Sequence, residues 1–213
     1  MLFDQWLLPQ DTFATDKMDS ARLAGIMVLV DHPKAPWIAA YIVQGNLVVR
    51  HPYELPANNP LNCTRDQILL VAAALHRQNN SHDAIDLYEA AKSRGWRAQN
   101  TEADIVGSTK PWYNGADALS PSHKLHLALA AGYRGSFIGY SWLAFDIVFN
   151  AIFTPTREPN QLLAQVILAG PKWVRFYKKV TPKWRQAISD YWIKSWRGEA
   201  ELGQMLIDKI ESM

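Results

Sequence analysis

Hydrophobic residues recur at three- and four-residue intervals along most of the chain, which is the spacing of amphipathic helices. The clearest case begins at Thr64-Arg65-Asp66-Gln67, which has the sequence of a capping box and precedes the nearly all-apolar run 68–75 of a buried helix. Proline and glycine divide the rest of the chain into further segments. Helices are expected over about residues 16–30, 81–94, 120–133, 136–153, 159–170, 181–197 and 199–211.

Two segments do not follow the helical pattern. Residues 37–49 fit a short helix followed by a strand as well as they fit a hairpin around a Gly-Asn turn. Residues 50–63 contain three prolines and several asparagines, so they predict a loop, as do residues 96–119. We therefore expect an all-α fold, a single domain over residues 1–213 with about nine helices and at most a short hairpin or strand near residues 41–50.

Composition places the chain among ordinary globular proteins. Hydrophobic residues make up 48% and charged residues 20%, so there is enough apolar surface for a core, which excludes intrinsic disorder. Cys63 is the single cysteine and has no partner for a disulfide within the chain. The first residues lack the pattern of a signal peptide. Because the common nucleotide-binding, nucleophile-elbow and paired-cysteine motifs are absent from the sequence, we expect no cofactor and no metal.

The longest apolar stretch, residues 135–153, is about as long as a membrane span. It contains Asp146, and a charge near the middle of a span costs roughly 2.5–3.5 kcal/mol. We therefore expect a helix buried in a core and no membrane span. Trp142, Asp146 and Asn150 follow one another at intervals of one helical turn, so they share one stripe of this helix, and Asp146 predicts either a cleft or a buried salt bridge.

Polar residues gather before and at the start of the helix that Thr64 caps. The free amides of a helix N-terminus suit an anion, and Asp66 in the first turn can act as a general acid or base if its pKa is raised. Asp66 and Gln67 are also favourable helix-start residues, so a structural role is the alternative. Nearer the N-terminus, Asp19 and Arg22 share one helix face, where they form either an exposed ion pair or a charged pair in a cleft.

Three polar segments resemble the motifs of an uncharacterised family of bacterial and phage proteins. That family has D-S-x-x-R-T/G, R-H-P and N-x-S-R-D-Q in this order, and the matching residues here are Asp19, Ser20, Arg22, Arg50, His51, Pro52, Asn62, Thr64, Arg65, Asp66 and Gln67. The resemblance covers about residues 15–75 and departs in the spacing of the first motif and in the threonine at position 64. The family is similar in helix pattern to the α/α-toroid enzymes that act on polysaccharides. The resemblance implies that these residues converge, and a toroid of about nine helices would be a reduced one. Because the first residues lack the pattern of a signal peptide, we expect a protein that is cytoplasmic in a bacterial host or associated with a virion.

If these residues converge, two reactions on an anionic glycan are open. Asp66 and Asp19 can share the acid and base roles across a glycosidic bond, as in a glycoside hydrolase. Alternatively, His51 or a tyrosine removes a proton beside a uronate carboxylate that Arg65 and Asn62 neutralise, as in a polysaccharide lyase. The expected substrate-binding residues are Arg22, Arg50, Asn62, Arg65, Gln67, Trp142 and Asp146. The leading hypothesis is therefore binding or cleavage of an anionic glycan.

Residues 171–197 form a basic and aromatic segment, with eight lysines and arginines, one acid and seven aromatic residues. Such a composition suits nucleic acid, an anionic glycan or a membrane surface. The structural alternative is two amphipathic helices that bury the aromatic rings and leave the lysines in solvent. The expected anion-binding residues are Lys172, Arg175, Lys178, Lys179, Lys183 and Arg185. They carry the alternative hypothesis, a non-enzymatic structural or interaction protein that contacts nucleic acid or another protein through this segment.

Two smaller features carry candidate chemistry. His123 and His126 have a spacing that can share a metal, but no third ligand is obvious, so two surface histidines are expected. Cys63 lies beside a helix N-terminus, a position that lowers the pKa of a thiol and can make it a nucleophile. Exposure separates the two hypotheses, because a solvent-reachable polar cluster lined by tryptophan favours an enzyme and a fully buried network favours a scaffold.

Overall fold

A computed structural model describes residues 2–10, 20–43, 46–54, 58, 63–99, 118–153, 159–181 and 200–213, and only the backbone of residues 150–153, 159 and 200. Within these residues the chain forms eight α-helices and two small two-stranded sheets, which confirms the mostly helical fold. The α-helices are α1 (Ser20–Leu29), α2 (Arg65–Arg77), α3 (Ser81–Ser93), α5 (Pro121–Ala130), α6 (Phe137–Phe153), α7 (Pro159–Ala169), α8 (Pro171–Val180) and α10 (Ala200–Ser212).

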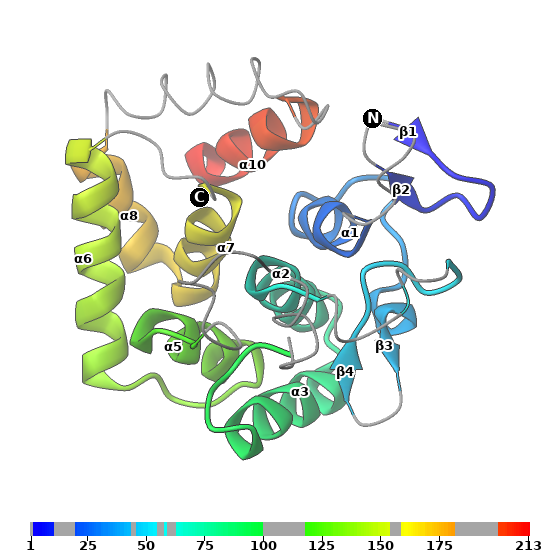
Figure 1. The fold of residues 1–213 in the computed structure, drawn as a ribbon. Coiled ribbons are helices and arrows are strands. Elements are labelled where there is room, and N and C mark those ends of the chain that lie inside the picture. The colour runs from blue at the N-terminus through cyan, green and yellow to red at the C-terminus, as the bar shows by residue number, and fades with distance from the viewer. Residues whose placement is uncertain are drawn as a thin grey trace, which may run out of the picture.

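Helix α2 lies at the centre of the molecule, with α1, α3, α5 and α7 packed around it (Figure 1). Its residues from Gln67 to Leu75 are all buried, which explains why this segment is apolar on every face. The helix begins with the expected capping box, in which the backbone NH of Thr64 donates to Gln67 Oε1 at 2.8 Å. Because a buried helix occupies the centre, the described helices show no toroid.

Helices α1 and α2 pack side by side and run in the same direction. Arg22 near the start of α1 faces Asp66 near the start of α2, and Asp31 just after α1 binds Arg77 at the end of α2. The two backbones approach closely at Gly25, where a Cβ atom would lie 2.8 Å from the backbone of α2. A larger residue at this position would force the two helices apart.

Helix α5 runs in the same direction as α2. His126 Nε2 of α5 lies 2.7 Å from the carbonyl oxygen of Leu69, in the first half of α2. Towards the other end, His76 Nδ1 of α2 lies 3.2 Å from the carbonyl oxygen of Ala130, the last residue of α5. The N-terminal ends of α1, α2 and α5 are therefore at the same end of the bundle.

Two short antiparallel hairpins lie beside the helices. The strands are β1 (Leu2–Phe3) with β2 (Pro9–Gln10), and β3 (Ile42–Val43) with β4 (Leu47–Val48). A 3-10 helix, η2 (Ile38–Tyr41), leads directly into β3. Both alternatives for residues 37–49 are thus correct in part, since a short helix and a hairpin follow one another. The N-terminal hairpin was not expected from the sequence.

Helices α7 and α10 pack against α1, and α6 and α8 pack against α7, so that all four share one apolar core with α1. Helix α10 is also attached by charge, because Lys209 Nζ lies 2.5 Å from Asp31 Oδ2. Arg77 of α2 binds the same carboxylate at 2.7 Å. Asp31 therefore links the C-terminal helix to the ends of α1 and α2.

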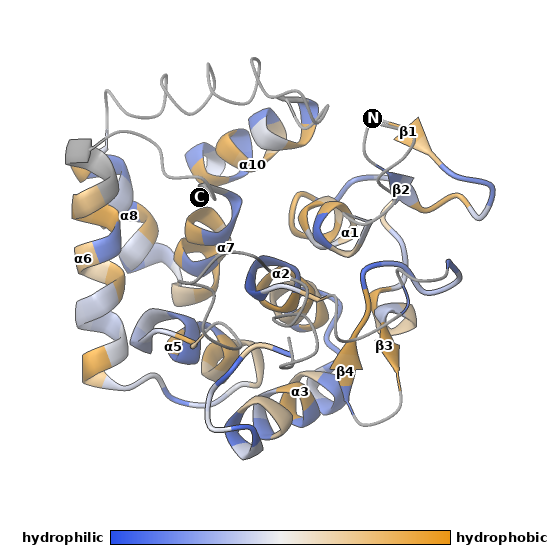
Figure 2. Cartoon of the chain, viewed as in Figure 1, coloured by the Kyte–Doolittle hydropathy of each residue, from blue (hydrophilic) through white to orange (hydrophobic). Residues whose placement is uncertain are grey.

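The apolar helix α6 is not fully buried, and in this respect the sequence prediction was wrong. One face packs against α5, α7 and α8 through the buried residues Leu143 and Ile147. The opposite face is exposed and carries Phe137, Ile138, Trp142, Phe145, Val148 and Phe149. Figure 2 shows hydrophobic segments along α6 although this helix lies at the edge of the molecule. The prediction failed because hydropathy alone does not tell a buried helix from one whose outer face is apolar.

Some expectations concern residues that the structure does not describe. Helix α8 is the first of the two amphipathic helices expected within residues 171–197, and the second falls outside the described residues. The same holds for most of the loop expected over residues 96–119. Among the described helices, none combines the length and the apolar character that crossing a membrane requires.

Candidate functional site

A charged cluster lies where the N-terminal ends of α1 and α2 meet. Arg22 Nε and Asp66 Oδ2 are 3.8 Å apart, and both side chains are mostly buried. The hydroxyl of Thr64 donates a hydrogen bond to Asp66 Oδ1. The first turn of α2 thus holds the Asp66 carboxylate between a guanidinium and a hydroxyl. Asp19, the expected partner of Arg22, lies outside the described residues.

Two further arginines act on Cys63, the residue that precedes Thr64. Burial raises the pKa of the Cys63 thiol far above its usual value, and the charges of Arg50, Asp66 and Arg94 also act on it. The lowered pKa expected for this thiol is therefore wrong, because burial outweighs the helix N-terminus. Burial also lowers the pKa of Arg94, whose Nε and Nη2 atoms have no hydrogen-bond partner among the described residues.

The N-terminal end of α5 brings neutral polar groups to this end of the molecule. Ser122 Oγ donates to Asp146 Oδ2 of α6 at 2.7 Å, and burial raises the pKa of the Asp146 carboxyl. His123 Nδ1 accepts a hydrogen bond from the backbone NH of Ser120 at 3.2 Å. Burial, assisted by the charge of Arg65, lowers the pKa of His123 to about 3. His123 is therefore neutral near pH 7 and lies within the electrostatic influence of Arg65.

His126 is also buried, which corrects the expectation of two surface histidines. Burial lowers the pKa of His126 to about 4, so this ring is neutral as well. Its Nε2 atom hydrogen-bonds to the backbone of α2, so the ring joins two helices. The described residues hold no group of three side chains that could bind a metal ion.

The His51 ring is fully buried and both of its nitrogen atoms have partners. Nε2 donates to Asp4 Oδ2 at 2.6 Å, and this carboxylate is also almost fully buried. Nδ1 accepts from the backbone NH groups of Tyr53 and Glu54 at 3.2 and 3.1 Å. Because neither nitrogen is available to a substrate, this geometry supports a structural role and gives no support to proton removal by His51.

The other expected site residues lie in different surroundings. Gln67 is fully buried and accepts the hydrogen bond that caps α2, whereas Trp142 lies on the exposed face of α6. Helix α8, which packs against α6 and α7, carries four of the expected anion-binding residues, namely Lys172, Arg175, Lys178 and Lys179. Four other expected site residues lie outside the described residues, namely Asp19, Asn62, Lys183 and Arg185.

We call the charged group at this end of the molecule the arginine cluster; its members are Arg22, Arg50, Arg65, Arg94 and Asp66. The N-terminal ends of three parallel helices add the positive potential of their helix dipoles. Guanidinium groups bind carboxylates, sulfates and phosphates with paired hydrogen bonds. The arrangement is therefore suited to an anion. The cluster is half-buried, which is intermediate between the two alternatives considered from the sequence, an open cleft and a fully buried network.

Sequence reasoning missed three residues that shape this end of the molecule: Asp4, Arg94 and Ser122. A signal for Arg94 was present, because α2 and α3 are equally long at 13 residues and a short turn joins them. The end of α3 therefore returns to the start of α2. Asp4 and Ser122 belong to no pattern in the sequence, since their partners His51 and Asp146 lie far away along the chain.

No protein-family model, curated protein or solved structure matches this chain.

Proposed function

We propose that the protein binds an anionic glycan at the arginine cluster. The observation that carries this proposal is the convergence of four arginines at the shared N-terminal end of α1, α2 and α5. Their positive charge and the dipoles of the three helices favour a carboxylate or sulfate group over a neutral sugar.

Exposed aromatic rings near Arg50 support a sugar as the body of the ligand. Tyr53 follows Arg50 closely in the chain, and its ring lies 5.7 Å from that of Trp6. Both rings are exposed, and the buried pair of His51 and Asp4 holds the segments that carry them. Aromatic rings with an exposed face pack on the apolar face of a sugar, so they suit this ligand class.

Cleavage is a separate question from binding, and the proposal assigns it to Asp66. This carboxylate lies inside the arginine cluster, whereas both nitrogens of His51 are engaged in hydrogen bonds. We therefore favour hydrolysis, with Asp66 as one of the two carboxyl groups, over β-elimination by His51. Asp19 remains the proposed second carboxyl group, as expected from the sequence.

Calorimetric titration tests the proposed binding. The ligands are an acidic oligosaccharide of uronate units and a neutral oligosaccharide of the same length. Wild-type protein should bind the acidic one, and Arg65→Gln should weaken its binding at least about tenfold, which corresponds to about 1.4 kcal/mol. The matched control is Arg97→Gln, an exposed arginine outside the cluster, which should bind normally. Equal binding of both sugars, or unchanged binding by Arg65→Gln, would contradict the proposal.

The alternative of nucleic-acid contact through residues 171–197 rests on α8. Its exposed residues Lys172, Arg175 and Lys179 can meet phosphates. Its aromatic rings turn toward the protein, and Trp173 stacks on Tyr140 of α6 with ring centroids 5.4 Å apart. Within the described part of this segment no ring is presented for base stacking, so we favour the glycan. Binding of single-stranded DNA that disappears at high salt, with no sugar binding, would reverse this preference.

A further inference from the structure

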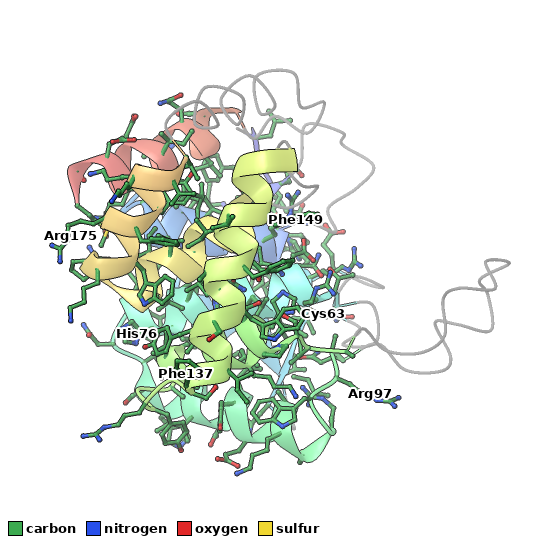
Figure 3. All side chains as sticks on the ribbon, turned by 90° about the vertical axis from the view of Figure 1, so that its left-hand side faces the viewer. Cys63, His76, Arg97, Phe137, Phe149 and Arg175 are labelled. Carbon is green, nitrogen blue, oxygen red and sulfur yellow. The ribbon has the colours of Figure 1, made fainter. Side chains whose placement is uncertain are left out.

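The outer side of α6 is a mostly apolar surface, with Ser141 as its exposed polar residue among the described side chains. We call it the α6 face; its members are Phe137, Ile138, Trp142, Phe145, Val148 and Phe149, all exposed. The ring of Phe145 lies 5.9 Å from that of Trp142 and 5.7 Å from that of Phe149, so the aromatic side chains form a connected row. Figure 3 looks onto this side of the molecule, with Phe137 near one end of the helix and Phe149 near the other. Exposed apolar surfaces of this kind mark sites that bind another protein or a membrane.

Helix α8 places positive charge beside the α6 face. The two helices are in direct contact, because Trp173 of α8 stacks on Tyr140 of α6. Lys172, Arg175 and Lys179 are exposed and recur at helical spacing, so they form one stripe, which we call the α8 stripe. In Figure 3 Arg175 projects outward at the left edge of the view, to one side of α6.

Negative charge is scarce on the same two helices. Helix α8 contains no acidic residue, and α6 contains a single one, Asp146. The carboxyl of Asp146 is half-buried and accepts a hydrogen bond from Ser122, so it is turned away from the α6 face. The surface therefore combines an apolar row with flanking cations, which is the pattern of helices that lie in the interface of an anionic bilayer.

We propose that the α6 face and the α8 stripe dock on an anionic lipid surface, with α6 lying in the membrane plane. A helix of this length lies flat over roughly 25 Å, and phenylalanine and tryptophan favour the boundary between headgroups and acyl chains. The lysines and arginine then meet the anionic headgroups. A second copy of the chain fits less well, because its own α6 and α8 offer almost no acidic residue for the α8 stripe to meet.

Vesicle co-sedimentation tests this proposal, with phosphatidylcholine vesicles compared with vesicles that contain three parts in ten of phosphatidylglycerol. Wild-type protein should bind the anionic vesicles at least about tenfold more tightly than the neutral ones, and high salt should weaken the binding. Two variants should each reduce binding about tenfold or more. One replaces exposed rings of the α6 face, Phe137→Ser with Phe145→Ser, and the other replaces the α8 stripe, Lys172→Gln with Arg175→Gln and Lys179→Gln.

Matched control variants show whether a loss of vesicle binding is specific to the α6 face and the α8 stripe. Leu7→Ser with Trp37→Ser removes apolar side chains that are 76% and 59% exposed, close to the 86% and 57% of Phe137 and Phe145. Lys34→Gln with Lys92→Gln and Arg97→Gln removes three exposed charges elsewhere on the molecule. Both controls should bind anionic vesicles like the wild type, and all variants should keep the wild-type circular dichroism spectrum.

Three results would overturn the proposal. Equal binding to both kinds of vesicle would show that charge plays no part. Equal losses of vesicle binding in the test and control variants would show that this surface is not the binding site. Absence of vesicle binding is the third result. If the protein then forms a dimer that Phe145→Ser dissociates in analytical ultracentrifugation, a second copy is the occupant of the α6 face.

Discussion

Individual polar residues of this protein are defined by their surroundings more than by their intrinsic chemistry, and His51 is the clearest case. Its partner Asp4 accepts backbone hydrogen bonds from Trp6 and Leu8 through Oδ1, both at 2.9 Å. Asp4 Oδ2 binds His51, whose other nitrogen accepts two backbone amides. The pair therefore joins the N-terminal hairpin to the loop after β4 through hydrogen bonds that are shielded from water.

We expect His51→Ala to destabilise the fold strongly. The change leaves the Asp4 carboxylate buried without its partner, and loss of one member of a buried pair costs roughly 3–5 kcal/mol. Urea denaturation monitored by circular dichroism measures this loss. The control His82→Ala removes an exposed ring and should change the unfolding free energy little. A fully stable His51→Ala protein that has lost only catalytic activity would show that the ring serves chemistry and not structure.

The two buried histidines of α5 predict sensitivity to acid. The pKa values of His123 and His126 are lowered to about 3 and about 4, both below the value of about 6.5 in the unfolded chain. At a pH between the folded and the unfolded pKa, each ring binds a proton in the unfolded state but not in the folded state. Stability therefore falls as the pH drops below about 6.5, by about 2 kcal/mol per histidine at pH 5.

The measurement for this prediction is the unfolding free energy at pH 7, 6 and 5. His126→Gln should remove about one of the protons that the unfolded state binds in excess. The unfolding free energy of this variant should therefore fall less steeply with falling pH, whatever its absolute stability. His82→Gln, which changes an exposed histidine, should leave the slope unchanged. A wild-type protein whose stability is constant from pH 7 to pH 5 would show that these rings are solvated.

At the scale of elements, the contact between α1 and α2 depends on the absence of a side chain at Gly25. We expect Gly25→Ala to lower the unfolding free energy by about 1–3 kcal/mol, because the added methyl group would lie 2.8 Å from the α2 backbone. In an unconstrained helix the same substitution would be stabilising. Thermal melting distinguishes the two outcomes, and an unchanged or raised Tm would contradict a close contact between α1 and α2 at Gly25.

Most elements could be predicted from the sequence because their ends carry local signals. Thr64 with Gln67 and Ser120 with Pro121 start α2 and α5 where the capping patterns indicate. These signals act within a single turn of helix, so they do not depend on the rest of the chain. The β1–β2 hairpin carries no such signal: its strands have two residues each, too few for a recognisable alternation.

The environment of each element was harder to predict, because it depends on tertiary packing. The apolar composition of α6 is compatible with burial on all sides, yet only the side with Leu143 and Ile147 is buried. For the candidate site, the sequence indicated Arg22, Arg50, Arg65 and Asp66 but not Arg94, which reaches them through the turn between α2 and α3. The residue types predicted which chemistry is possible, whereas the fold was needed to show which of these residues lie close together.

At the scale of the whole molecule, a substitution of Asp66 tells whether the arginine cluster has a functional or a structural role. Asp66→Asn keeps the size of the side chain but removes the charge that Arg22 faces. If Asp66 acts in hydrolysis, we expect loss of cleavage of the acidic oligosaccharide in a reducing-sugar assay, with Tm within a few degrees of wild type. If the protein unfolds instead, the ion pair with Arg22 is a structural link, because removing one charge of a mostly buried pair is costly.

Binding of an acidic sugar at the shared N-terminal end of α1, α2 and α5 can be located on the chain by amide hydrogen exchange, measured with and without the acidic oligosaccharide. We expect slower exchange at residues 20–22, 63–67 and 120–123, with the neutral oligosaccharide as the inactive control. Slower exchange confined to α8, or no change at these three helix starts under saturating ligand, would contradict it.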